Sequence, residues 1–189
     1  TLYGGGVGAP LSGLINLVSR DPGASAALEV GVRGGSFNTW GGDFNGGLPV
    51  AGGALRLGLS ASYEAADSYI RSIDSTRYAI YPTAAMELGA NTSLTLRGQI
   101  TRIEQQEYAG LPFALTKIPG VDRFAFAGST DAPPTTIENK LVTATLVHRF
   151  SDDLEGVVSA RRYDSHFEES STFPFTGDPL AGTSYAFAT

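Results

Sequence analysis

Long stretches of the sequence alternate between apolar and polar residues, and this alternation limits how the chain can fold. In residues 54–64, Leu55, Leu57 and Leu59 occupy every second position, with arginine, glycine and serine between and after them. Successive side chains of a β-strand point to opposite faces, so the pattern predicts a strand with one apolar and one polar face. Strands of this kind are predicted over residues 27–34, 38–48, 54–64, 77–88, 92–104, 139–150 and 154–168.

Two of these strands carry local ambiguities. Pro82 cannot donate to a ladder of backbone hydrogen bonds, so a bulge or local distortion is expected there. In the strand 154–168, Val157 and Val158 compete for the apolar face, so the alternation leaves the facing of this strand open.

The connections between the predicted strands alternate in length. The turns at 49–53, 89–91 and 151–153 are short, whereas the connections at 65–76, 107–138 and from 169 onward are long. Transmembrane β-barrels have short periplasmic turns, long extracellular loops and strands of about ten residues. Aromatic residues near strand ends would suit the two girdles of such a barrel: Trp40, Tyr63, Tyr78 and Phe150. The sequence therefore predicts an all-β fold, an open curved sheet of about seven antiparallel strands from a transmembrane barrel, with little helix.

The alternation also predicts which side chains face lipid. A charge that faces lipid at mid-bilayer costs about 2–4 kcal/mol, whereas a charge in the lumen can be hydrated or paired. We expect the convex, lipid-facing side to carry Leu55, Leu57, Leu59, Leu94, Leu96, Ile100, Val142 and Leu146. We expect the concave side to carry Arg56, Ser60, Arg97, Gln99 and Thr101.

The N-terminal segment differs from the rest of the chain. A glycine-rich turn over residues 4–10 leads into residues 13–19, a short apolar run that predicts a strand buried on both faces. This segment resembles the end of the plug domain of TonB-dependent outer-membrane receptors. The matching residues are Leu2, Tyr3, Gly4, Gly13, Ile15, Asn16, Val18, Ser19, Arg20 and Pro22, while Ser12 departs from the usual glycine pair. The resemblance implies that residues 1–22 end a plug domain and residues 23–189 begin its barrel.

The same resemblance implies a function for the whole receptor. Such a receptor lies in the outer membrane of a Gram-negative bacterium, binds a scarce ligand outside the cell and imports it with energy from the TonB–ExbB–ExbD complex. A ferric siderophore is the favoured ligand, and haem, cobalamin or a glycan are alternatives. Two other classes stay open: a passive porin or adhesin-type barrel, and a soluble β-solenoid or sandwich.

Composition and motifs argue against other functions. The net charge is −6 and no basic stripe is present, which argues against a nucleic-acid partner. Residues 4–9 fit a loose dinucleotide fingerprint, but Pro10 and a strand-like run follow where a helix is required. His148 and His166 are predicted to lie roughly 33 Å apart across a hairpin, too far to share a metal ion. We therefore predict no catalytic residues, no metal site and no cofactor.

The long connection 107–138 is the best candidate for ligand contact. It carries aromatic and cationic residues of the kind that anchor recognition surfaces: Tyr108, Phe113, Arg123, Phe124 and Phe126. Packing of these side chains onto their own or neighbouring loops is the equally weighted alternative. Residues 110–112, Gly-Leu-Pro, are similar to a step that siderophore-type receptors show after an early barrel strand.

Overall fold

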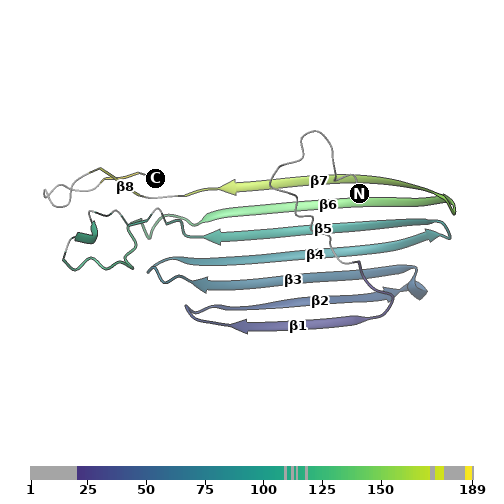
Figure 1. The fold of residues 1–189 in the computed structure, drawn as a ribbon, viewed down its shortest axis with the longest axis horizontal. Helices are drawn as coiled ribbons and strands as arrows, with labels where there is room; N and C mark the ends of the chain where they lie inside the picture. The colour runs from purple at the N-terminus through teal and green to yellow at the C-terminus, as the bar shows by residue number, and fades with distance from the viewer. Residues whose placement is uncertain are drawn as a thin grey trace.

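The computed structural model describes residues 21–108, 110–111, 113, 115–117 and 119–170, and the backbone of 173–176 and 186–188. Seven strands form one antiparallel sheet in sequence order (Figure 1). They are β1 (Ala27–Gly34), β2 (Trp40–Val50), β3 (Leu55–Asp67), β4 (Asp74–Gly89), β5 (Thr92–Gln105), β6 (Thr135–Ser151) and β7 (Leu154–Glu168). The predicted all-β, antiparallel fold is confirmed. Helical structure in the described residues is limited to two short 3₁₀ turns, η1 (Ala51–Gly53) and η2 (Leu115–Lys117).

A small second hairpin, which the sequence did not predict, follows the main sheet. β8 (Phe173–Thr176) pairs antiparallel with β9 (Ala186–Ala188). The plug motif and the predicted strand over 13–19 lie outside the described residues, so the division at residue 22 stays a prediction.

The seven strands predicted from residue 27 onward all form, but several extend further than predicted at one end of the sheet. β6 begins at Thr135 instead of residue 139, and Thr135 pairs with Gln105 of β5. β3 likewise ends at Asp67, which pairs with Asp74 at the start of β4. Backbone pairing therefore continues where the apolar alternation stops, because a ladder of hydrogen bonds does not require apolar side chains. The long connections shorten accordingly to residues 68–73 and 106–134.

One face of the sheet collects the apolar side chains. Directly paired residues share a face, and Leu57 pairs with both Leu48 and Ala84. Leu94 similarly pairs with Met86 and Leu146. The register places every predicted lipid-facing residue on this apolar face, namely Leu55, Leu57, Leu59, Leu94, Leu96, Ile100, Val142 and Leu146. The register also settles β7, in which Val158 pairs with Leu146 and shares this face.

The opposite, polar face carries the residues predicted for the lumen. Ser60 donates a hydrogen bond to the Asn45 side chain (2.9 Å), and Arg97 forms an ion pair with Asp21. Pro22 lies against the same face, since a Cβ added to Gly58 would lie 3.4 Å from the Pro22 ring. Arg56, Gln99 and Thr101 share this face by register, so the predicted separation of the two sets is confirmed.

Pro82 distorts the ladder locally, as predicted, but produces no bulge. It pairs with Leu59 of β3, and the register between β4 and β5 is the same on both sides of Tyr81 and Pro82, which themselves pair with no β5 residue. Gly98 of β5 makes room for the proline, because a Cβ there would lie 2.8 Å from the Pro82 ring. The register shift that β4 does show lies instead between Glu87 and Gly89.

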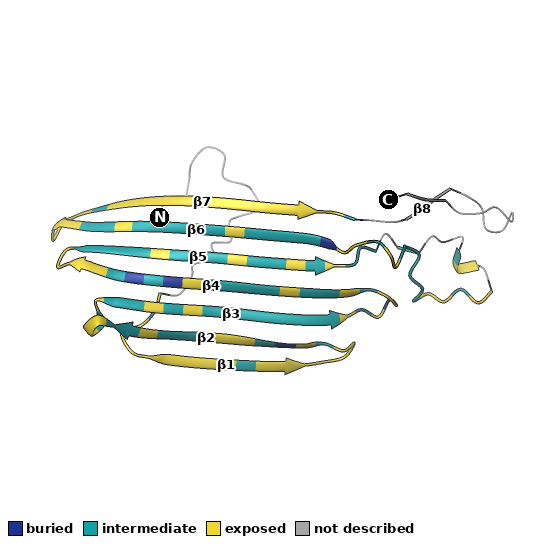
Figure 2. Cartoon of the chain, turned by 180° about the vertical axis from the view of Figure 1, so that it is seen from behind, coloured by how far each residue is buried: buried dark blue, intermediate teal, exposed yellow. Residues whose placement is uncertain are grey.

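The sheet has little protein interior. Among the described apolar residues, only Ile70 and Ala85 are buried, at 5% and 4% exposure. Exposed positions cover most of β1 and β7, the two edge strands (Figure 2). None of the described helices is long and apolar enough to cross a lipid bilayer. The leucine-rich face thus offers a broad apolar surface that is favourable only against a nonpolar surrounding or further protein.

Candidate ligand-binding rim

The antiparallel order gathers the longer connections at one end of the sheet, which we call the rim. The rim contains the connections 35–39, 68–73 and 106–134. The opposite end carries the tight turns at 51–54, 90–91 and 152–153. This is the asymmetry expected for a barrel with one elaborated outer mouth.

Three aromatic rings link the three rim connections. The ring centroids of Phe37 and Tyr69 lie 6.4 Å apart, and those of Tyr69 and Phe124 lie 6.3 Å apart, both in edge-to-face geometry. A backbone hydrogen bond also ties the first connection to the last residue of β3, directly before the second connection, because Asp67 N–H donates to the Phe37 carbonyl (2.9 Å). Phe37 adopts a positive φ of 56°, a strained conformation for a bulky residue that persists only where its surroundings hold it.

Polar contacts join the second and third connections. The Arg71 guanidinium lies 2.5 Å from Oδ2 of Asp122, and Arg71 N–H donates to the Phe124 carbonyl (3.1 Å). The other carboxylate oxygen of Asp122 accepts from Phe124 N–H (3.1 Å), which fixes the turn that carries Phe124. The connection 68–73 is therefore tied to residues 122–124 by both side-chain and backbone bonds.

The five predicted ligand residues fall into separate contacts in the described part of the connection. Arg123 stacks over the Phe124 ring, with its guanidinium carbon 4.5 Å from the ring centroid. Tyr108 and Phe126 pack together with centroids 6.2 Å apart. Phe113 is 74% exposed, and Lys117 Nζ lies 4.6 Å from its ring. Phe124 also packs on a neighbouring connection, as the packing alternative expects, and Arg123 and Phe113 remain exposed at the surface.

Sequence reasoning missed several rim residues. Phe37 and Tyr69 extend the aromatic surface, and Arg71 anchors it to Asp122. Only the composition of residues 68–73 could have drawn attention to Tyr69 and Arg71, and nothing in the sequence singled out Phe37, since the alternation that locates strands says nothing about contacts between loops. The prediction that His148 and His166 do not meet is confirmed, because His166 pairs with Glu138, ten positions from His148 on β6. No group of acidic or histidine side chains in the described part of the chain could hold a metal ion.

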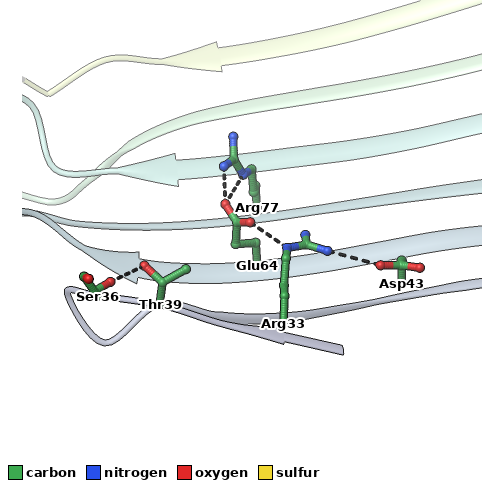
Figure 3. A network of polar contacts seen from close by, with 6 residues as sticks. All are labelled: Arg33, Ser36, Thr39, Asp43, Glu64 and Arg77. Atoms are coloured by element: carbon green, nitrogen blue, oxygen red, sulfur yellow. Dashed lines mark hydrogen bonds and ion pairs between the residues drawn. The ribbon is translucent and has the colours of Figure 1, made fainter. Parts of the chain in front are cut away.

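A second polar arrangement lies on the polar face just below the rim (Figure 3). The Glu64 carboxylate pairs with Arg77 and with Arg33 Nε (2.9 Å), and Arg33 also reaches Asp43 (3.2 Å). These residues come from β1, β2, β3 and β4, so the network ties four strands together across their polar face. Its two arginines and two carboxylates balance, which makes it a neutral polar wall.

Charged residues also appear on the apolar face, where the prediction placed none. Near the middle of the sheet, Arg162 of β7 forms an ion pair with Asp164 (2.9 Å) and stands opposite Val142 of β6. Near the rim, Arg102 of β5 forms an ion pair with Glu138 of β6 (2.8 Å). On β3 and β4 the corresponding level is aromatic: Tyr63 pairs with Tyr78, which pairs in turn with Arg102. Near the rim, the apolar face thus carries aromatic rings on β3 and β4 and charged residues on β5 and β6.

Known proteins match this chain by fold. No protein-family model matches the sequence, and no curated protein matches it. Among solved structures, the FpvAI–pyocin S2 complex matches with a TM-score of 0.70 at 17% sequence identity, covering 84% of this chain and 22% of the matched chain. The pyoverdine outer membrane receptor FpvA from Pseudomonas aeruginosa PAO1, bound to pyoverdine, gives a TM-score of 0.68 at 17% identity, covering 84% and 24%.

A third solved structure agrees with these two. The ferripyoverdine receptor of the Pseudomonas aeruginosa outer membrane, bound to ferripyoverdine, gives a TM-score of 0.67 at 17% identity, covering 84% and 22%. This chain therefore spans less than a quarter of the receptor chains that it matches. At this identity the comparison establishes architecture, and the seven-stranded sheet has the fold of part of the β-barrel of a ferripyoverdine-type TonB-dependent receptor.

Proposed function

We propose that this chain is part of a TonB-dependent receptor in the outer membrane of a Gram-negative bacterium, and that the receptor takes up a ferric siderophore. The observation that carries the proposal is the coincidence of an apolar face, a polar face and a rim of long connections in one sheet. A wall between lipid and an aqueous lumen needs both faces, and a receptor mouth needs the rim. The plug motif in residues 2–22 supports energy coupling, which a passive porin would not need.

The rim supplies the ligand contacts in this proposal. Residues 107–138 make the main contribution, and residues 65–76 help. The proposed contacts are Tyr108, Phe113, Arg123, Phe124 and Phe126. Aromatic faces suit the packing of a bulky chelate, and an arginine suits charge-assisted hydrogen bonds to its anionic groups. Two of the matched receptors are bound to pyoverdine or ferripyoverdine, which favours a siderophore over haem, cobalamin or a glycan.

The partners follow from the same proposal. The receptor would draw energy from the TonB–ExbB–ExbD complex and would contact outer-membrane lipid through the leucine-rich face. Nucleic acid is not a partner. The ion pair between Asp21 and Arg97 and the contact of Pro22 with Gly58 would mark where the plug joins the lumen wall.

Growth under iron limitation tests the function. A strain that carries only the full-length receptor is supplied with a panel of ferric siderophores, and growth on at least one of them is expected. Deletion of residues 112–134 should abolish this growth while the barrel still reaches the membrane, which immunodetection in outer-membrane fractions can show. Growth that persists in a strain without TonB would contradict energy coupling and favour a passive porin.

A further inference from the structure

We propose that Arg71 is a positioning residue, which holds residues 122–124 in place so that Arg123 can contact an anionic group of the ligand. The inference rests on the proposed function, because it assigns the clamp to the proposed ligand-contact segment. Arg71 belongs to a different connection from the residues that it holds, and 51 positions separate it from Asp122.

The contacts form a reciprocal clamp. The side chain of Arg71 forms an ion pair with the side chain of Asp122, and the backbone N–H of Arg71 donates a hydrogen bond to the carbonyl of Phe124. The Asp122 carboxylate also accepts a hydrogen bond from the backbone N–H of Phe124, so each of its two oxygens has its own partner. Removal of the Arg71 side chain would therefore loosen the turn at residues 122–124. Only the bond within the turn, from Phe124 N–H to Asp122, would still hold the Asp122 side chain.

The connection 68–73, which carries Arg71, is itself held in place by burial and by internal hydrogen bonds. Ile70, the residue before Arg71, is one of the two buried apolar residues of the described chain. Ser68 N–H donates to the Ile73 carbonyl (2.8 Å), and Ser68 Oγ accepts from Ile70 N–H (3.1 Å), which closes the connection on itself. The edge-to-face contact of Tyr69 with Phe124 lies beside the ion pair and reinforces it. Arg71 is thus presented from an ordered connection.

The ion pair between Arg71 and Asp122 also leaves the positive charge of Arg123 without a neighbouring counter-charge from Asp122. Asp122 and Arg123 are neighbours in sequence, and an unpaired Asp122 carboxylate could neutralise the Arg123 guanidinium. Arg71 neutralises Asp122 instead, and Arg123 makes no ion pair with any described residue. The positive charge of Arg123, supported on the Phe124 ring, is therefore left for an anionic group of a ligand.

Two readouts on the full-length receptor in detergent test the proposal. Chymotrypsin cleavage after Phe124 and Phe126 reports how well the turn is held. Titration with the ferric siderophore that supports growth reports ligand affinity. The variants are Arg71→Ala, Asp122→Asn, their combination, and Arg71→Lys, which keeps the charge. Arg149→Ala is the matched control, because Arg149 makes an exposed pair with Glu155 (3.9 Å) at the opposite end of the sheet.

We expect Arg71→Ala and Asp122→Asn each to raise the cleavage rate and weaken binding by about two- to fivefold, the range of an exposed ion pair. The combination should do little more than the larger single change, because both remove one interaction. Arg71→Lys should retain most of the affinity, and Arg149→Ala should match the wild type.

Unchanged cleavage in both single variants would overturn the clamp. Faster cleavage with unchanged affinity would overturn its positioning role. A wild-type receptor that binds no siderophore of the panel would overturn the proposed function and the ligand part of this inference together, while the cleavage rates would still decide whether the clamp exists.

Discussion

The two faces of this sheet are built from the same strands but suit different surroundings. On the apolar face, Leu59 is 40% exposed, and its direct partners on β2 and β4 are the uncharged Gly46 and Pro82. On the polar face, Glu64 is bound by two arginines and keeps only 16% of its side chain exposed. One face leaves apolar surface uncovered, and the other satisfies its charges within the protein. This difference is what separates a membrane wall from a soluble sandwich, whose two sheets would bury the leucines against each other.

Of the three substitutions, Leu59→Arg should have the largest effect on membrane assembly, and it tests whether the two faces differ. Leu59 lies on the apolar face of β3, and Ser60 lies next to it on the polar face. An arginine that faces lipid at mid-bilayer costs about 2–4 kcal/mol, so Leu59→Arg should sharply reduce the folded protein in the outer membrane. Ser60→Arg is the matched control and should assemble nearly normally. Equal loss for both variants, measured in outer-membrane fractions and by urea denaturation in detergent, would show that the faces are not distinct.

Gly98→Val should have the next largest effect, because it tests how β4 and β5 fit together on the apolar face. Its Cβ would lie 2.8 Å from the Pro82 ring, and overpacking of this kind costs about 1–3 kcal/mol. Pro82→Ala in the same protein should recover part of that loss, since it removes the ring. Urea denaturation measures the free energy of unfolding of the single and the double variant. A full loss in the double variant would argue against contact between these two residues.

The sequence predicted the faces of the sheet better than the ends of its strands. Residues 27–34 form a strand with the predicted bounds, because alternation continues to both ends. Residues 154–168 also keep their predicted bounds, although Val157 and Val158 interrupt the alternation there. β6 begins four residues before its predicted start, since Thr135–Glu138 pair through the backbone without an apolar pattern. The periodicity of apolar residues detects strands that have one apolar face. It does not detect polar residues that extend the same ladder of backbone hydrogen bonds.

The candidate site was less predictable than the fold. Phe124 and Arg123 could be named because aromatic and cationic residues stand out in a long connection. The bond from Arg71 to Asp122 could not, because it depends on how two connections fold back toward each other. Contacts across 51 residues of irregular chain leave no periodic trace in the sequence.

Glu64→Gln should have the smallest effect of the three substitutions, and it tests the polar face. The glutamine keeps the shape of the side chain but removes the charge that Arg33 and Arg77 share. We expect a lower urea midpoint than the wild type, with a smaller shift at high salt, where ion pairs are screened. Normal assembly in the membrane is expected, because the exposed arginines remain hydrated. Loss of assembly as large as that of Leu59→Arg would contradict the small, salt-dependent contribution that we assign to these ion pairs.

Cysteine labelling in intact cells tests the central claim that the sheet is a membrane wall with its rim outside. These 189 residues contain no cysteine, so in a receptor without other cysteines single ones can be placed at Ser72 in the rim, at Ala90 in a tight turn and at Leu57 on the apolar face. A membrane-impermeant maleimide should label the Ser72→Cys receptor rapidly in intact cells. Ala90→Cys should react only after the outer membrane is permeabilised, and Leu57→Cys should stay unreactive in both. Rapid labelling of Ala90→Cys or Leu57→Cys in intact cells would contradict the account.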